Sequence, residues 1–121
     1  MTELKLIVAG GRDFNNYEQL SRAIHKFEQT QFIDAQISIV SGMARGADAL
    51  GVRFAKENNV VLYEFPADWE KYGKAAGFKR NTEMAMFSHA LIAFWDGKSS
   101  GTRHMIRTMK QHGKFVQVIS Y

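Results

Sequence analysis

The chain has 121 residues, of which 45% are hydrophobic and 23% are charged, and its formal net charge is +4. This length fits one domain spanning residues 1–121, and the composition is typical of a globular protein rather than a disordered or low-complexity one. The absence of cysteine excludes disulfides, thiolate nucleophiles and cysteine-ligated metal sites.

The pattern of apolar and basic residues bears on location and partners. No apolar run approaches the roughly 18–20 residues that a membrane span needs, and the first residues lack the basic and apolar regions of a secretory signal. We therefore expect a cytoplasmic protein without a membrane partner. The positive charge favours anionic partners, and because the sixteen Lys and Arg are scattered, it favours a phosphate-bearing small molecule over a long polyanion.

Short apolar runs alternate with segments of helical periodicity. The apolar runs predict strands over residues 4–9, 37–40, 60–63, 90–94 and 115–119. A first helix follows Asn15 or Asn16, either of which can cap it, and a second begins just after Gly46. A third helix begins near residue 77 or 78 and runs through 87, and a fourth ends before Gly113. This alternation predicts a Rossmann-like three-layer α/β/α sandwich with a mostly parallel five-stranded sheet.

The connection over residues 65–78 interrupts the alternation. Pro66, the only proline, favours an extended or turn conformation after the third strand. The residues that follow are numerous and aromatic for a connection, and long ordered loops in small domains are often functional. We therefore expect this segment to be a functional loop.

Glycine-rich basic segments follow the first, second and fourth predicted strands. In parallel sheets ligands bind at the carboxyl ends of strands, where helix N-termini direct free amides toward an anion. Glycines allow close approach of the backbone, while basic and hydroxyl side chains add hydrogen bonds. With Arg80 from the third helix, the predicted ligand-binding residues are Gly10, Gly11, Arg12, Asp13, Ser41, Gly42, Arg45, Gly46, Asp48, Asp96, Gly97, Lys98, Ser99, Gly101 and Thr102. The alternative is that these segments are tight turns with solvated arginines.

None of these segments matches the P-loop or the dinucleotide-binding fingerprint, which disfavours Walker-type ATP hydrolysis and ordinary nicotinamide binding. Instead, the chain resembles a small subfamily, of the domain-of-unknown-function type, within the SLOG superfamily. The motifs that carry this resemblance are GRDF at 11–14, SGMARGAD at 41–48, FPADW at 65–69, YGKAAG at 72–77, RN at 80–81 and GT at 101–102.

The resemblance spans about residues 4–119. The superfamily includes Rossmann-like domains related to the Lonely-guy phosphoribohydrolases and to the DNA-processing protein of natural transformation. It implies a nucleotide or nucleotide-derived ligand above the strand ends.

The same resemblance raises the question of catalysis. Lonely-guy enzymes carry an Arg-Lys-x-x-Met helix motif and a Pro-Gly-Gly-x-Gly-Thr-x-x-Glu loop. Residues 80–84 are similar to the first and keep its arginine, whereas Met105 stands where the second has its catalytic glutamate. Methionine cannot act as the carboxylate that cleavage of an N-glycosidic bond requires. If the chain is an enzyme, its candidate catalytic residues are Arg80 and Glu83, with Asp13 or Asp96 as substitutes for the glutamate; otherwise Glu83 is an ordinary surface residue.

Further residue types suit parts of a nucleotide. Asp13, Asp48 and Asp96 could accept hydrogen bonds from ribose hydroxyls or hold Mg²⁺ that accompanies a nucleotide, and Asp48 could instead cap its own helix. The candidates for stacking on a base are Trp69, Tyr72 and Trp95, which could equally be core or rim residues. The four histidines have no metal-ligand spacing, so no protein-bound metal site is predicted, and His104 is the one beside the Gly-Thr loop.

The leading hypothesis from the sequence is that the protein binds a nucleotide or nucleotide-derived ligand, such as an ADP-ribose or nucleoside-monophosphate compound, for sensing or sequestration. A nucleotide-processing enzyme, a phosphoribohydrolase or N-glycosidase, is the alternative, and binding of single-stranded nucleic acid ranks below it. We also expect a homo-oligomer, a dimer or larger, because related enzymes build their sites near a dimer interface and a domain of this size has little depth to enclose a ligand.

Overall fold

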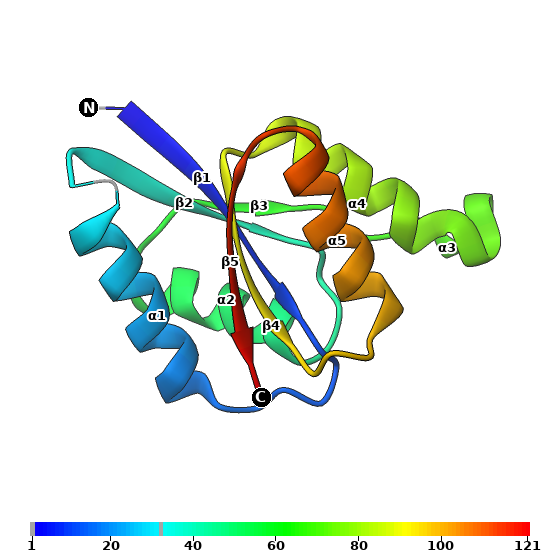
Figure 1. Ribbon diagram of the computed structural model, residues 1–121, viewed down its shortest axis with the longest axis horizontal. Coiled ribbons are helices and arrows are strands. Elements are labelled where there is room, and N and C mark those ends of the chain that lie inside the picture. Colours follow the sequence, from blue (N-terminus) through cyan, green and yellow to red (C-terminus); the bar gives the residue numbers. More distant parts are fainter. Residues whose placement is uncertain (1, 32) are drawn as a thin grey trace.

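A computed structural model describes residues 2–31 and 33–121, and these form a five-stranded sheet between two layers of helices (Figure 1). The strands are β1 (Thr2–Gly10), β2 (Ala35–Ser41), β3 (Leu62–Glu64), β4 (Ala90–Trp95) and β5 (Phe115–Ser120). Their order is β3-β2-β1-β4-β5, and every neighbouring pair is parallel. The predicted Rossmann-like α/β fold is confirmed, although β3 begins two residues later than expected.

The helices of the described chain are α1 (Tyr17–Thr30), α2 (Ala47–Glu57), α3 (Trp69–Tyr72), α4 (Ala76–Phe87) and α5 (Ser100–Gln111). Asn16 is the cap of α1, because its Oδ1 accepts a hydrogen bond from the Gln19 amide at 3.0 Å. None of these helices combines the length and apolar character that crossing a bilayer requires.

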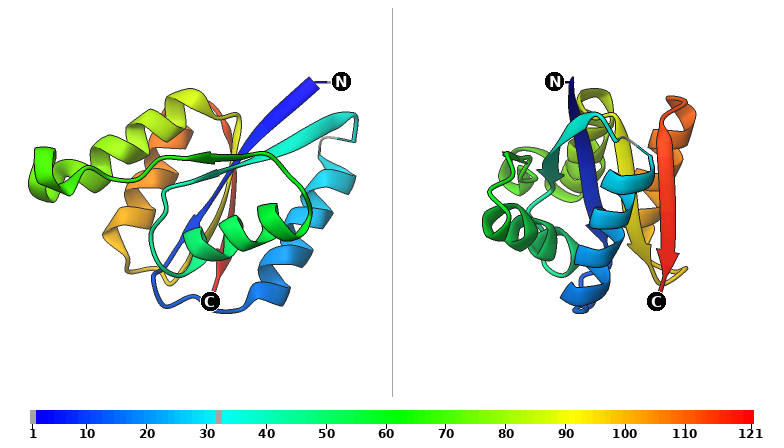
Figure 2. Two further views of the ribbon diagram at one scale, coloured as in Figure 1. Left: turned by 180° about the vertical axis from the view of Figure 1, so that it is seen from behind. Right: turned by 90° about the vertical axis from the view of Figure 1, so that its left-hand side faces the viewer.

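Two hydrophobic clusters attach the helices to opposite faces of the sheet. Along β1, Leu6 and Val8 belong to the cluster under α1 and α2, whereas Ile7 and Ala9 belong to the cluster under α4 and α5. This alternation is what a strand buried on both faces requires. Figure 2 shows α2 in front of the sheet in the rear view, opposite the face that α5 covers in Figure 1.

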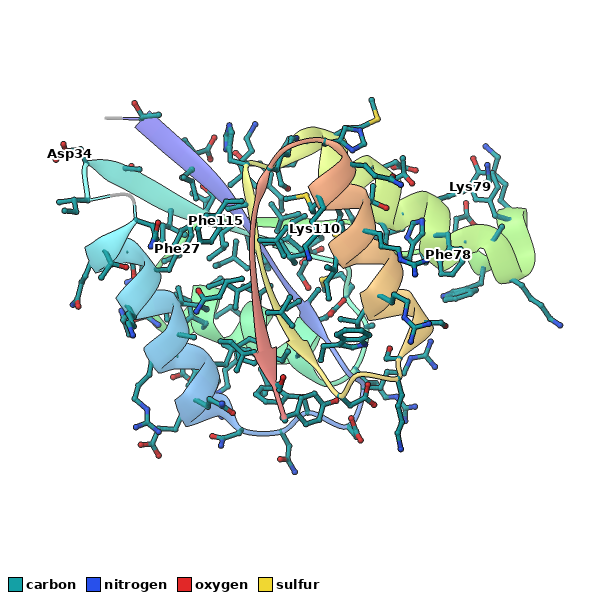
Figure 3. The ribbon with its side chains drawn as sticks, viewed as in Figure 1. Phe27, Asp34, Phe78, Lys79, Lys110 and Phe115 are labelled. Carbon is teal, nitrogen blue, oxygen red and sulfur yellow. The ribbon has the colours of Figure 1, made fainter. Side chains whose placement is uncertain are left out.

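The described aromatic side chains add to the α1–α2 face. Phe27, Phe54 and Phe94 are fully buried, and each contributes about 1.5–3 kcal/mol by leaving water. Phe27 of α1 packs edge-on against Phe115 at the start of β5, with ring centroids 5.4 Å apart (Figure 3). This contact holds the edge strand against the first helix.

Residues 65–78, predicted to be a loop, are largely helical. Asp68 caps α3 by accepting a hydrogen bond from the Lys71 amide at 3.1 Å, and a 3₁₀ turn, η1 (Gly73–Ala75), then leads directly into α4. Gly73, at φ 55°, provides the bend between α3 and this turn. We call residues 69–80, which comprise α3, η1 and the start of α4, the arm; it extends away from the sheet (Figure 1).

Candidate functional site

A cleft of about 620 Å³ opens at the carboxyl ends of β1, β2 and β4. This is the edge at which chain order in the sheet reverses, since β1 is flanked by β2 on one side and β4 on the other. The predicted residues that line it are Gly10, Gly11, Arg12, Asp13, Asp48, Trp69, Arg80, Asp96, Ser99, Gly101 and Thr102. Segments far apart in the sequence therefore meet around one cavity.

Other predicted residues do not line this cleft. They are Ser41, Gly42, Arg45, Gly46, Tyr72, Glu83, Trp95, Gly97 and Lys98. Arg45 and Lys98 are exposed, and Gly97 occupies the turn after β4 at φ 81°. Tyr72 and Glu83 line a second hollow of about 250 Å³, which Arg80 also borders.

Several of these residues shape the loops that border the cleft. The Ser41 hydroxyl is buried, accepts a hydrogen bond from the Met43 amide at 3.1 Å and donates to the Asp48 carbonyl at 3.2 Å. The Trp95 indole donates to the Ser99 carbonyl at 3.1 Å and so fixes the turn before α5.

Gly46 brings the first two loops together. Its φ is 75°, and a Cβ there would lie 2.1 Å from the Gly11 carbonyl oxygen. Without one, the Ala47 amide donates to that oxygen at 3.2 Å. The first amide of α2 is therefore already occupied, which differs from the expectation that this helix N-terminus would face an anion.

The N-terminus of α5 borders the cleft, and its approach is fixed by Asp96. Asp96 Oδ1 accepts hydrogen bonds from the Lys98 and Ser99 amides, both at 2.8 Å, and these bonds lower the Asp96 pKa and fix the approach to the helix. A Cβ added at Gly101 would meet nothing within 4 Å. Ser99, Ser100, Gly101 and Thr102 all line the cleft, so the first turn of α5, where the free amides and the positive end of the helix dipole lie, borders the cavity.

Arg80 is held in place by the β2 loop, which is the segment of residues 42–46 between β2 and α2. Its Nη1 donates to the Gly42 carbonyl at 2.5 Å, and its Nε donates to Asn81 Oδ1 at 3.1 Å. A Cβ at Gly42 would lie 2.7 Å from Arg80 Nη1 and 2.8 Å from Asp48 Oδ2. Gly42 thus leaves the space that the guanidinium occupies, although it does not itself line the cleft.

Asp48 is the buried carboxyl group of the cleft. It is 5% exposed, and its Oδ2 accepts a hydrogen bond from the Ala44 amide at 3.3 Å, so it braces the β2 loop rather than acting as the N-cap of α2. Burial raises the pKa of Asp48 to about 6, against the opposing effect of the Arg80 charge. Burial likewise lowers the Arg80 pKa, while Asp48 raises it.

Asn81 joins this arginine to α5. It is buried, accepts from Arg80 Nε, and donates from Nδ2 to the Gly101 carbonyl at 3.1 Å. The same nitrogen lies 3.2 Å from His104 Nδ1, and burial lowers the His104 pKa, which favours the neutral ring that can accept this hydrogen bond. Although Asn81 belongs to a motif that carried the resemblance, its linking role was not predicted.

Tyr121 does not line the cleft, but it holds Asp13, which does, and no pattern in the sequence indicated this contact. Its hydroxyl donates to Asp13 Oδ1, and its ring packs edge-on against Phe14 at 5.0 Å. Burial and the Asp13 carboxylate raise the Tyr121 pKa to about 12. The chain end lies beside the loop after β1 (Figure 1), and no local signal marks a contact across 108 residues.

The remaining lining residues were also not assigned to the site. They are Ala9, Ala44, Lys74, Gly77, Phe78, Asn81, Met84, Ser100 and Met105. Among residues 2–31 and 33–121, no three His, Asp or Glu side chains lie close enough to hold a metal ion, so Asp13, Asp48 and Asp96 do not form a shared cation site. The arrangement suits an anion beside α5 and Arg80, with carboxylates available for hydroxyl groups.

Comparisons with known proteins identify the family of this chain. Residues 4–72, from β1 to α3, match the family described as YspA, cpYpsA-related SLOG family. The chain is also 39% identical over 89 residues to Gene 61 protein of Mycobacterium phage D29, an alignment that covers 69% of this chain and 70% of the relative. The chain therefore belongs to the YspA, cpYpsA-related SLOG family.

Proposed function

We propose that the protein binds a nucleotide or nucleotide-derived ligand, such as an ADP-ribose or nucleoside-monophosphate compound, and that it senses or sequesters it. Membership of the SLOG family indicates a nucleotide-related function. The observation that carries the proposal is the meeting, in one cleft, of the open first turn of α5 at Gly101 with the guanidinium of Arg80.

The cleft offers complementary groups for each polar part of such a ligand. A phosphate beside Gly101 would receive amide hydrogen bonds and the favourable helix dipole. Arg80 and Arg12 both line the cleft, and a hydrogen bond from a charged group contributes about 1.5–3 kcal/mol. The Asp13 and Asp96 carboxylates also line it and would accept hydrogen bonds from ribose hydroxyls, and any Mg²⁺ would arrive with the nucleotide.

Substitutions at Gly101 test this proposal without disturbing the fold. Because a Cβ there meets nothing within 4 Å, both Gly101→Ala and Gly101→Asp are expected to fold. An aspartate in the first turn favours the helix dipole, yet its carboxylate would repel a bound phosphate. Calorimetry with AMP, ADP-ribose and other nucleotides should show binding tighter than millimolar by wild type and Gly101→Ala, and a loss of at least about tenfold for Gly101→Asp. Absence of binding across the panel, or unchanged binding by Gly101→Asp, would contradict the proposal.

The same ligands test a nucleotide-processing activity. The observation that favours this activity is the buried carboxyl group of Asp48. A buried carboxyl group with a pKa of about 6 can exchange a proton near neutral pH. Against this activity, Met105 lines the cleft and Glu83 does not. Chromatography of AMP and ADP-ribose after incubation with the protein decides the question, because N-glycosidase activity would release free base and a binding protein would return the ligand intact.

A further inference from the structure

We infer that the arm end of the cleft is a stacking subsite for a planar base, formed by Trp69 and Phe78. The cleft would then bind a nucleotide more tightly than a phosphorylated sugar that has the same charge but no base. This inference rests on the proposed function, because it places the base of the ligand in the part of the same cleft that the phosphate would not fill.

The first observation is that two large aromatic side chains are left exposed at the cleft wall. Trp69 is 53% exposed and Phe78 is 46% exposed, and both line the cleft. A soluble protein tends to bury side chains of this size, and apolar surface gathered at a cavity marks a binding site more often than apolar residues scattered singly do. A bound ligand with a flat apolar group would bury these two rings.

The second observation is that Phe78 is fixed in orientation. Its ring stacks on His104 with centroids 4.2 Å apart and planes 11° apart, and His104 is in turn positioned by the buried Asn81. Since one face of the Phe78 ring is covered by the imidazole, its exposed surface belongs to the other face and the edges. Figure 3 shows Phe78 and Lys79 on opposite sides of α4, with Phe78 on the side toward α5. A base placed on Phe78 would continue a stack that already exists.

The third observation places this aromatic pair within reach of the anion site. A Cβ at Gly77 would lie 3.6 Å from Trp69 Cη2 and 3.8 Å from Arg80 Nη2. Gly77 lines the cleft, so the indole and the guanidinium border the same short stretch of its wall. A ligand whose phosphate contacts Arg80 therefore has its next group beside the arm. The cleft volume of about 620 Å³ lies in the range of small-molecule sites and exceeds what a phosphate alone would fill.

The matched probes are AMP, ADP-ribose and ribose 5-phosphate, the last of which has a phosphate and a ribose but no base. Stacking of one base on aromatic side chains corresponds to about a 5- to 150-fold gain in affinity. We expect AMP and ADP-ribose to exceed ribose 5-phosphate by this factor in calorimetry. Trp69→Ala should reduce the nucleotide affinities toward that of ribose 5-phosphate and leave ribose 5-phosphate unaffected, and Trp69→Phe, which keeps a ring, should retain most of the gain.

The two tryptophans of the chain supply a second measurement, because Trp69 lines the cleft and Trp95 does not. In Trp95→Phe protein, where Trp69 is the single indole, AMP should quench the emission, whereas in Trp69→Phe protein it should not.

The outcomes separate this inference from the proposed function. Equal affinity for the three probes, or no emission change in Trp95→Phe protein that binds AMP, would overturn the base subsite and leave the phosphate site intact. Absence of binding by all three would overturn both.

Discussion

Substitution of Gly42 by alanine should weaken ligand binding in the cleft, although Gly42 does not line the cleft. The φ of Gly42 is not in the left-handed region, so alanine can adopt the same backbone conformation. Its Cβ, however, would lie 2.7 Å from Arg80 Nη1, and ordinary contact begins at 3.4 Å. The guanidinium must therefore retreat by about 0.7 Å or abandon its hydrogen bond to the Gly42 carbonyl.

Two magnitudes follow from this displacement. Overpacking of a close-fitting site costs about 1–3 kcal/mol, and the lower part of that range applies because Arg80 is a long side chain that can swing toward the cleft. A misplaced Arg80 loses a charge-assisted hydrogen bond to the ligand, about 1.5–3 kcal/mol, which corresponds to a loss of affinity of about 10- to 150-fold. Gly101→Ala is the matched control, because its added Cβ has open space.

A double-mutant cycle identifies the route of the effect. Urea unfolding measures the stability of Gly42→Ala, and calorimetry with ADP-ribose measures its affinity. If Gly42 acts through Arg80, then Gly42→Ala should cost little further affinity in an Arg80→Ala background, which gives a coupling energy close to the whole single-mutant effect. Additive losses in the double variant, or full affinity in Gly42→Ala protein, would refute this reasoning.

Two further predictions concern the acidic side chains of the cleft. The pKa of Asp48 in the folded protein, about 6, lies above the ordinary 3.8. Between about pH 4 and 6 the folded protein therefore holds a proton that the unfolded chain has released. As the pH rises through this range, the free energy of unfolding should fall by at most about 3 kcal/mol. Asp48→Asn should remove that fall in urea unfolding at a series of pH values, and parallel curves for the two proteins would speak against it. Tyr121→Phe keeps the packing on Phe14 but loses the hydrogen bond to Asp13. Urea unfolding should show a free energy of unfolding about 0.5–1.5 kcal/mol lower than that of the wild type. An unchanged unfolding midpoint would contradict this prediction.

Local patterns were sufficient to predict most of the fold. The apolar runs predicted each of the five described strands, most clearly β4, which is apolar without interruption because it is buried on both faces. Asn16 and Gly46 marked helix starts through capping and turn geometry that short sequence windows contain. The arm was mistaken for a loop because its first helix is only four residues long, too short to show a period.

The lining of the cleft was predictable where its residues follow a strand end or belong to a motif of the resemblance. Gly10, Gly101 and Arg80 could be assigned because each belongs to a recognisable segment. The contacts of Asn81 and Tyr121 could not, because they depend on side chains from distant elements meeting in space. The role of Gly42 likewise appears only when the position of Arg80 is known.

The central claim is that a phosphate binds at the first turn of α5, where separate loops converge. A ¹H–¹⁵N correlation titration of the isotopically labelled protein with AMP tests it most directly, because each backbone amide reports on its own surroundings. The claim predicts that the largest shifts fall on Ser100, Gly101 and Thr102. The Gly11 and Ala47 amides should change little, because they already donate to the Phe94 and Gly11 carbonyls. Shifts that centre on the start of α1 or on β5, with the α5 amides unchanged, would contradict it.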